Sequence, residues 1–382
     1  EQRGPLVAAP RGSLARALRR AVGARPCAPL SAAARCSPAA APSTAQAGPA
    51  HGVVGGAGEG VAAMERCEPS CCGHCLARAA FAATFLVASV PTWAYVAISD
   101  VCDALVSACT TRSEVSVGQE ALAARRAHGA FVGRAISKSW QLALRVCCWL
   151  RVDASGLRPL EDAGGGERRL FICANHASYM DTVLICAYMP RHLVGEAKTL
   201  MARKHLGMPV LGRIANHVGH MPVPFTSSSR GNYAVDKAKM AELMANVDRC
   251  IEGGGHLAIF PEGDLNPEPD VLLPFRAGGM DICIRHDMEV WAWVMTGQAD
   301  CWPVDAAIGG RPSSIQLRAE RLHHSAREAA ARLAGPGADA REQAIALAAD
   351  LRARMQGMLD EMLGNRAPPV LGPSSSCPKT KL

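Results

Sequence analysis

Strand-like and helix-like segments alternate through residues 168–318, and this alternation limits the possible fold more than any other feature of the chain. Short apolar runs bounded by turn residues indicate buried strands, and longer runs with apolar residues three and four apart indicate helices. The expected strands are 168–174, 193–197, 217–223, 256–260, 289–295 and 314–318. The expected helices are 181–189, 198–207, 232–252 and 277–286. This order predicts an α/β fold, a mixed sheet with flanking helices.

A histidine and an aspartate stand where the first of these strands passes into a helix. The apolar run Leu170–Ala174 ends at Asn175, and His176 and Asp181 follow. Imidazole has the side-chain pKa nearest neutrality, and a neighbouring carboxylate fixes its tautomer and stabilises its protonated form. The pair therefore has the chemistry to take a proton from an alcohol that attacks a carbonyl group.

The same residues also have a purely structural interpretation. Ser178 and Asp181 have the spacing of a capping box, in which side chains satisfy the free amides at a helix start. A lone histidine beside a turn, such as His176, is more often structural than catalytic. Taken alone, the pair leaves both interpretations open.

A second motif, Phe260-Pro261-Glu262-Gly263, follows the strand expected at 256–260. Its proline and glycine predict a tight turn, which presents the Glu262 carboxylate at the end of the sheet. Sites in α/β folds lie at the carboxyl ends of the strands. The two motifs in this order therefore favour a catalytic site over helix capping alone.

With these motifs the sequence resembles the glycerolipid acyltransferase family, which includes the lysophosphatidic acid acyltransferases. The family's first block, Asn-His-x-Ser-x-x-Asp, is complete in Asn175–Asp181, and its third block, Phe-Pro-Glu-Gly, is complete in Phe260–Gly263. The spacing of the second block is kept by Pro209, Gly212, Gly219 and Val223. The resemblance covers residues 150–310, under half of the chain.

The resemblance implies an O-acyltransferase that acts at a membrane and takes its acyl group from acyl-CoA or acyl carrier protein. It implies that His176 is the general base and that Asp181 orients it, with Asn175 and Ser178 in support. The acceptor is then a lysophospholipid or a related glycerolipid. The acceptor-binding residues implied are Phe260, Pro261, Glu262 and Gly263. Acyl-CoA is a co-substrate, and neither a further cofactor nor a metal is expected.

Three positions depart from the family pattern. Phe225 stands where the second block usually ends in an arginine, Leu265 where the third block usually has another, and Ala292 where the fourth has proline. A phosphate monoester calls for forked, charge-assisted donors. The losses favour an acceptor whose phosphate is diesterified or absent, unless another arginine substitutes. The expected substitutes are Arg230 and Arg276, with Arg203 and Arg213 as further candidates.

The charge pattern argues against nucleic acid as a partner. The formal net charge is +7, and only 4% of the residues are aromatic. The positive surplus is not gathered into Lys/Arg blocks interleaved with aromatic residues, as nucleic-acid sites require. Weak attraction to anionic lipid head groups is the better interpretation.

The 16 cysteines are scattered and form no disulfide framework, so reduced thiols are expected. One cluster, Cys67–Cys75, lies beside an apolar segment, and this position favours S-acylation. A zinc site or a redox pair is the less favoured alternative.

The apolar segment 79–99 carries no charge over 21 residues and lies between Arg78 and Asp100. As a helix rising about 1.5 Å per residue it would span roughly 30 Å, the thickness of a bilayer core. We expect one membrane helix here, with a buried helix or a cleaved signal as the alternatives. Residues 140–150 are too short to span and are expected to lie at the interface as an amphipathic helix. The expected location is a membrane, that of the endoplasmic reticulum, a plastid or another organelle.

The remaining segments complete the expected organisation. Residues 1–63 contain seven arginines and two acidic residues among many small ones, which is typical of a disordered leader or transit-like segment. The expected parts after it are a cysteine-rich juxtamembrane segment with its membrane helix at 64–150, an acyltransferase domain at 151–325, a helical extension at 326–366 and a flexible tail at 367–382. A methionine-rich stripe in the extension is expected to pack against the domain or the membrane.

Two functions from different classes fit the sequence. The first is an active membrane acyltransferase, and the second is a catalytically silent relative that binds lipid or serves as a scaffold. Intact His176, Asp181 and Glu262 favour the first. The chain has no Gly-x-Ser-x-Gly nucleophile turn, which favours direct transfer, and no glycine-rich phosphate loop after the first strand, which argues against a nucleotide-dependent enzyme.

Overall fold

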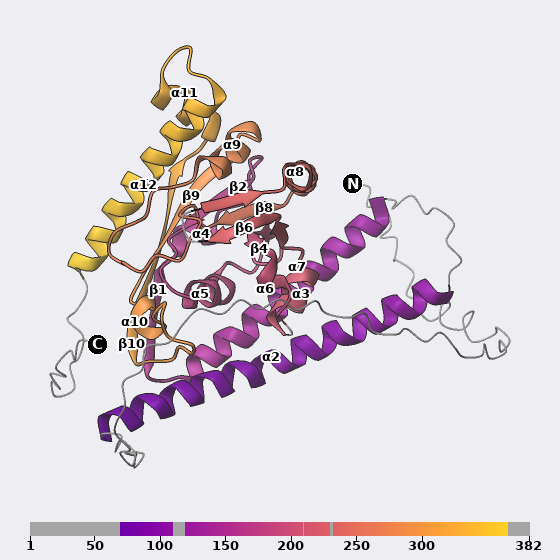
Figure 1. The fold of residues 1–382 in the computed structure, drawn as a ribbon, viewed down its shortest axis with the longest axis vertical. Helices are drawn as coiled ribbons and strands as arrows, with labels where there is room; N and C mark the ends of the chain where they lie inside the picture. The colour runs from indigo at the N-terminus through magenta and orange to yellow at the C-terminus, as the bar shows by residue number, and fades with distance from the viewer. Residues whose placement is uncertain (1–68, 110–118, 209, 230–231, 366–382) are drawn as a thin grey trace, which may run out of the picture. The chain divides into compact units, whose positions relative to one another are not determined.

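A six-stranded mixed sheet organises the part of the chain that the computed structural model describes, residues 69–109, 119–208, 210–229 and 232–365 (Figure 1). Its strand order is β1-β10-β9-β2-β8-β3. The bounds are β1 (Leu150–Gly156), β2 (Leu170–Ala174), β3 (Ala197–Lys198), β8 (His256–Ile259), β9 (Glu289–Thr296) and β10 (Ser313–His323). All neighbours in this sheet are parallel except β9 and β10. The predicted α/β class with a mixed sheet is confirmed.

Helices cover both faces of this sheet. Successive side chains of a strand point to opposite faces, and in β2 Leu170 and Ile172 join one buried cluster while Phe171 and Cys173 join the other. The first cluster includes residues of α2 (Pro69–Cys109), α3 (Gln119–Val146), α5 (Met180–Tyr188) and α7 (Leu211–Val218). The second includes residues of α8 (Lys237–Glu252), α9 (Ala277–Arg285), α11 (Ala326–Ala334) and α12 (Ala340–Gly364).

Short elements complete the described fold. They are α4 (Arg158–Glu161), α6 (Arg203–Leu206), α10 (Gln298–Cys301), β4 (Leu200–Ala202), β5 (Met221–Val223), β6 (Phe225–Ser229) and β7 (Asn232–Val235). The strands β4 and β5 form a parallel pair, and β6 and β7 form an antiparallel hairpin.

The segments between the two motifs differ most from the sequence prediction. The strand expected at 193–197 is a turn that enters the two-residue β3, and the helix expected at 198–207 is β4 followed by α6. The strand expected at 217–223 begins only at Met221, because α7 continues to Val218 and ends at Gly219, whose φ is 89°. The helix expected at 232–252 begins at Lys237, where the Asp236 side chain caps it.

The C-terminal helix α12 packs against the sheet domain. Its contacts are with α9, α11 and β9 and, over a smaller area, with β10, and Met355, Leu359 and Met362 on its stripe are buried. Asp339 and Glu342 form a capping box at its start. The methionine-rich stripe is therefore part of the protein core, whereas Ile345 lies off it and is exposed.

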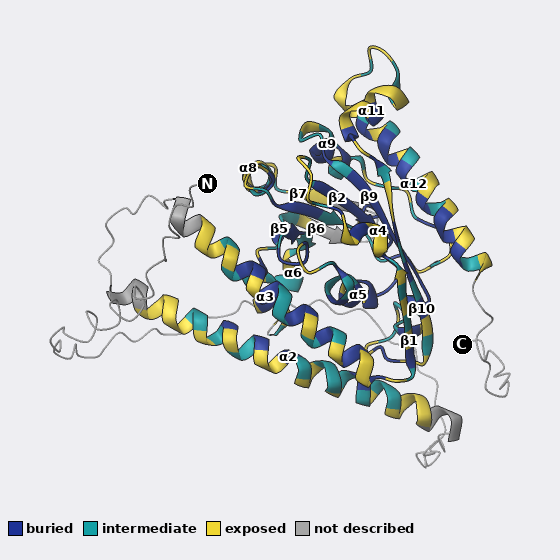
Figure 2. Cartoon of the chain, turned by 180° about the vertical axis from the view of Figure 1, so that it is seen from behind, coloured by how far each residue is buried: buried dark blue, intermediate teal, exposed yellow. Residues whose placement is uncertain are grey.

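The long helices α2 and α3 lie side by side in both ribbon views (Figures 1 and 2). Phe81 and Val96 of α2 are buried, and the Trp140 indole of α3 donates a hydrogen bond of 3.0 Å to the Ser89 hydroxyl. Residues 140–150, expected as an interfacial helix, form the end of α3 and the start of β1, with Leu142 and Val146 exposed; an interfacial role stays a prediction. Trp140 and Leu144 pack into the core there, so their apolar surface is already covered by protein.

Helix α2 also carries an uncovered apolar face. Within the described residues it is the one helix long and apolar enough to cross a membrane, over Gly73–Leu105. Yellow, exposed segments recur along α2 in Figure 2, and its large exposed apolar residues are Leu76, Leu86, Val87, Val90, Tyr95, Ile98, Val101 and Leu105. The predicted leader 1–63, the tail 367–382 and Cys67 lie outside the described residues.

Both ends of the uncharged segment contact the sheet domain. The Arg78 Nε donates to the carbonyl oxygen of Ile308 at 2.9 Å. The Asp100 carboxylate lies 3.1 Å from the Arg213 Nε and 2.9 Å from the His217 Nε2, both on α7. The helix is thus attached near each end to residues of the same domain.

Candidate active site

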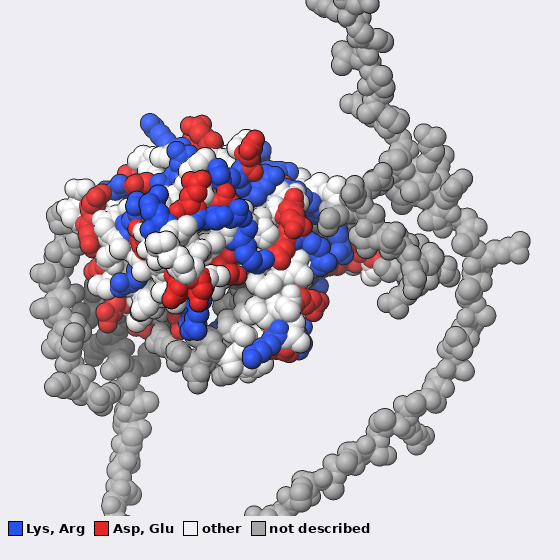
Figure 3. Space-filling view, turned by 90° about the horizontal axis from the view of Figure 1, so that it is seen from above, with Lys and Arg blue, Asp and Glu red and all other residues white. Residues whose placement is uncertain are grey.

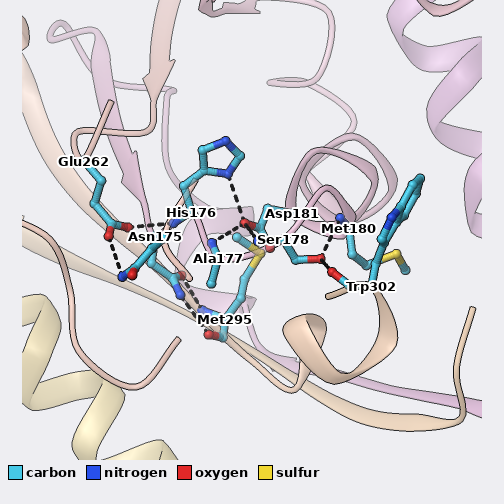
Figure 4. Close-up of polar contacts among 10 residues, drawn as sticks. Asn175, His176, Ala177, Ser178, Met180, Asp181, Glu262, Met295 and Trp302 are labelled. Atoms are coloured by element: carbon cyan, nitrogen blue, oxygen red, sulfur yellow. Dashed lines mark hydrogen bonds and ion pairs between the residues drawn. The ribbon is translucent and has the colours of Figure 1, made fainter. Parts of the chain in front are cut away.

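The topology brings the two sequence motifs together. Strands β2 and β8 are parallel neighbours, so their carboxyl ends meet at one edge of the sheet. His176 follows β2 and Glu262 follows β8, and the Glu262 carboxylate accepts a hydrogen bond of 2.7 Å from the His176 backbone amide. Figure 4 shows His176 between Glu262 on one side and Asp181 on the other.

His176 and Asp181 form a direct pair. The His176 Nδ1 lies 3.1 Å from the Asp181 Oδ2, and this oxygen also accepts from the amides of Ala177 at 2.7 Å and Ser178 at 2.9 Å. Asp181 is fully buried, and the His176 side chain is 21% exposed. Both sequence interpretations therefore describe real contacts: Asp181 satisfies amides at the helix start and also orients the imidazole.

Electrostatics at the pair follow from this burial. Burial raises the pKa of the Asp181 carboxyl, while the contacts from His176 and the two amides oppose that shift. The Nε2 of His176 has no hydrogen-bond partner among the described residues. An imidazole that is held through Nδ1 and open at Nε2 can accept a proton from a hydroxyl group placed there.

Glu262 is buried and anchors the loop that carries His176. Beside the His176 amide, its carboxylate accepts from Asn266 Nδ2 at 2.9 Å and from the Leu273 amide at 2.9 Å. Burial raises the pKa of the Glu262 carboxyl, and the three donors oppose that shift. Because both oxygens are engaged and the residue is 3% exposed, the observed contacts are those of a positioning residue. Its expected role in acceptor binding stays a prediction.

The rest of the Phe-Pro-Glu-Gly turn closes around the imidazole. The Phe260 ring stacks on His176 with centroids 4.0 Å apart and planes 14° apart. Gly263 has a φ of 68°, and a Cβ there would come within 2.1 Å of the Arg276 Nε. Pro261 is buried, and its carbonyl accepts from the Arg276 amide at 2.8 Å. The turn thus requires glycine for both conformation and space.

Asn175 and Ser178 fix the site to the neighbouring β9–α10 segment. The Asn175 side chain donates to the Met295 carbonyl at 3.0 Å and accepts from the Met295 amide at 2.9 Å. The Ser178 hydroxyl donates to the Trp302 carbonyl at 2.6 Å and accepts from the Met180 amide at 3.0 Å. These contacts anchor the turn that carries the pair, and the supporting role that the resemblance implies stays a prediction.

Sequence reasoning missed several residues that build the site. Asn266 joins the two motifs, since its backbone amide also donates to the His176 carbonyl at 2.7 Å. The partners at Met295, Trp302 and Leu273 act through backbone atoms, and so no side-chain pattern could reveal them. Asn266 was the one detectable signal, a polar residue within a turn directly after the third block.

The expected phosphate contacts are only partly brought to the site. Arg276 lies at the motif turn, where its Nε donates to the Glu262 carbonyl at 3.2 Å. Arg230 lies outside the described residues. Arg213 is paired with Asp100 beside α2. Phe225 begins β6, and Leu265 is half-buried in the loop after the turn.

The described residues form no evident metal centre, and the face drawn in Figure 3 shows no basic nucleic-acid surface. The described residues include no group of three or more His, Cys, Asp and Glu side chains that could hold a metal ion. On the face in Figure 3 the basic and acidic side chains of the described residues are interspersed, with no continuous patch of one sign.

Comparison with known proteins identifies the domain that carries this site. Residues 151–296 match the family model described as Acyltransferase. This part of the chain is an acyltransferase domain, and it contains both motifs of the site. The match covers under half of the chain, and it agrees with the resemblance that the sequence blocks indicate.

No curated protein matches the sequence. A solved structure similar to this one is the crystal structure of PlsC, the 1-acyl-sn-glycerophosphate (LPA) acyltransferase of Thermotoga maritima. It shares 14% sequence identity with a TM-score of 0.48, over 78% of this chain and 98% of that chain.

Proposed function

We propose that the protein is a membrane-associated O-acyltransferase. It moves an acyl group from acyl-CoA, or from acyl carrier protein, to the hydroxyl of a lysophospholipid or a related glycerolipid. The observation that carries this proposal is the His176–Asp181 pair, held at 3.1 Å with its Nε2 open, inside a domain of the acyltransferase family.

In the proposed reaction the His176 Nε2 accepts the proton of the acceptor hydroxyl as the oxygen attacks the thioester carbonyl. Asp181 holds the ring and stabilises the imidazolium that forms. The C–S bond then breaks, the ester C–O bond remains, and the proton passes from His176 to the thiolate. The thiol has a pKa of about 8.5, so the leaving group needs no strong acid.

The acceptor enters from the open side of the imidazole. Phe260 stacks on one face of the ring, and the loop fixed by Glu262 holds the backbone of His176. In this proposal Phe260, Pro261 and Gly263 border the acceptor, whereas Glu262 acts through its hold on that backbone. Preorganised contacts of this kind place the base at the reacting oxygen without further ordering.

Membrane association is proposed to run through α2. Its exposed apolar face is available to lipid, while Arg78 and Asp100 attach the helix to the sheet domain near both ends. Because the domain contacts both ends, we favour a helix that lies in the interfacial region over one that crosses the bilayer. An amphipathic helix in that position buries its apolar face among the acyl chains.

A thiol-release assay tests the proposed function. Wild-type protein with acyl-CoA is given lysophosphatidic acid, lysophosphatidylcholine or monoacylglycerol, and we expect acceptor-dependent thiol release. The His176→Ala variant should lose it. The matched control is His324→Ala, since that side chain is 66% exposed and lies outside the site. Release from neither protein with any acceptor would support the silent lipid-binding alternative.

A further inference from the structure

The short helix α6 (Arg203–Leu206) follows a strand that runs toward the active edge of the sheet. β3 is parallel to β8, with Lys198 level with Leu257. Phe260 lies three residues beyond Leu257, and α6 begins five residues beyond Lys198. Because β3 and β8 are parallel, both chains leave the sheet at the same edge, where β4 and α6 follow β3 and the Phe260 turn follows β8.

The histidine of α6 supports this placement. Burial lowers the pKa of His205, and the charges of Lys204 and His176 lower it further. The contribution of His176 to this shift agrees with the placement of α6 after β3 at the same edge of the sheet. The helix is therefore a neighbour of the catalytic pair rather than a distant surface element.

Two cations of α6 have no counter-charge within the described part of the chain. Arg203 and Lys204 are exposed, and neither side chain forms an ion pair or hydrogen bond with another described residue. Two other arginines that the sequence suggested as phosphate contacts already have partners in the protein. Arg213 pairs with Asp100, and the Arg276 Nε donates to the Glu262 carbonyl. The positive charge of α6 thus remains for a ligand.

Apolar surface follows these cations along the chain. Met208 is 42% exposed and Leu211 is 40% exposed. Uncovered apolar side chains next to unpaired cations match a molecule with an anionic group at one end and an acyl chain at the other. Lysophospholipids have that chemistry, whereas a neutral monoacylglycerol lacks the anionic group.

We propose that Arg203 and Lys204 bind the phosphate of the acceptor lipid and thereby set its specificity. This inference rests on the proposed function. The pair supplies the forked guanidinium and the point charge that a phosphate requires. It compensates for the apolar Phe225 and Leu265, and it gives phosphate-bearing acceptors an advantage over phosphate-free ones.

The test compares a double variant, Arg203→Gln with Lys204→Gln, with wild type. The matched control carries Arg332→Gln with Arg341→Gln, because both arginines are exposed on α11 and α12 and the charge change is the same. We expect the KM for lysophosphatidic acid to rise about tenfold or more in the double variant. The KM for monoacylglycerol should change far less, and the control should resemble wild type.

Three results would overturn the proposal. They are equal losses with both acceptors, a rise only in the KM for acyl-CoA, and weaker binding to phosphatidylglycerol vesicles with an unchanged acceptor KM. The last two would assign the cations to the acyl donor or to the membrane surface.

A binding measurement tests this proposal independently of the proposed catalysis. Lysophosphatidic acid, below its aggregation threshold, is titrated into the His176→Ala protein with and without the two α6 substitutions. Binding that weakens about tenfold supports the α6 site even if the wild type shows no turnover. Equal affinity in the two proteins refutes the site. Absent thiol release from the wild type refutes only the proposed catalysis.

Discussion

Glu262 gives the sharpest test of how the site is held. Its carboxylate accepts from the His176 amide at 2.7 Å and from Asn266 and Leu273 at 2.9 Å each, in a position that is 3% exposed. In Glu262→Gln one of the two oxygens becomes an NH₂ group. That group faces an N–H donor whichever way the amide is turned, so at least one hydrogen bond is lost.

The cost follows from these contacts. A hydrogen bond to a charged group contributes about 1.5–3 kcal/mol, and a buried donor left unsatisfied adds to the loss. We expect Glu262→Gln to lower the free energy of unfolding by about 3 kcal/mol. Because the His176 backbone loses an anchor, kcat should fall by about 100-fold, the usual effect of misplacing a catalytic group by about 1 Å. The acceptor KM should change little.

Urea unfolding and steady-state acyl transfer measure both quantities. Glu268→Gln is the control, since Glu268 is exposed in the same loop. Unchanged stability and kcat together with a raised acceptor KM would refute the positioning role. That outcome would instead assign Glu262 directly to acceptor binding.

Three further predictions concern the turn, acid stability and the membrane helix. Gly263→Ala should destabilise the protein by at least about 1 kcal/mol in thermal unfolding, because φ is 68° and the new Cβ meets Arg276; unchanged stability would contradict this. Burial lowers the pKa of His256 from 6.5 to about 4. Between these two pH values the unfolded state therefore binds more protons than the folded state. Stability should then be full above pH 6.5 and fall by roughly 3 kcal/mol toward pH 4, and a His256→Asn variant with an equally steep fall would rule out this source. Cys75 and Cys102 are both exposed and lie near opposite ends of the uncharged segment. Two variants that each keep one of these cysteines should react with an impermeant thiol reagent from the same side of a vesicle. Reaction from opposite sides would indicate a spanning helix.

The fold was predictable where apolar runs alone determine the structure. β2, β8 and β9 lie within two residues of their expected bounds, because buried parallel strands are continuous apolar runs. The segment from Pro190 to Val235 was not predictable in the same way. There the chain changes direction at local features, such as the left-handed Gly219 and the Asp236 cap, over elements of only a few residues.

In the candidate site, too, the contacts that are local in sequence were predictable and the long-range contacts were not. The pairing of His176 with Asp181 is local in sequence, and its spacing at a strand-to-helix turn indicates the contact. The hold of Glu262 on the His176 amide depends on β2 and β8 being neighbours, which only the sheet order provides. The backbone partners at Met295 and Trp302 have no sequence signal, because any residue offers the same carbonyl.

The most direct test of the central claim is a double-mutant cycle on the catalytic pair. The kcat/KM for acyl transfer is measured for wild type, His176→Ala, Asp181→Asn and the double variant. We expect His176→Ala to abolish transfer to within detection and Asp181→Asn to cost about 100- to 10,000-fold. Since both residues serve one proton transfer, adding Asp181→Asn to His176→Ala should cost little more. Wild-type turnover in the His176→Ala protein would contradict the account.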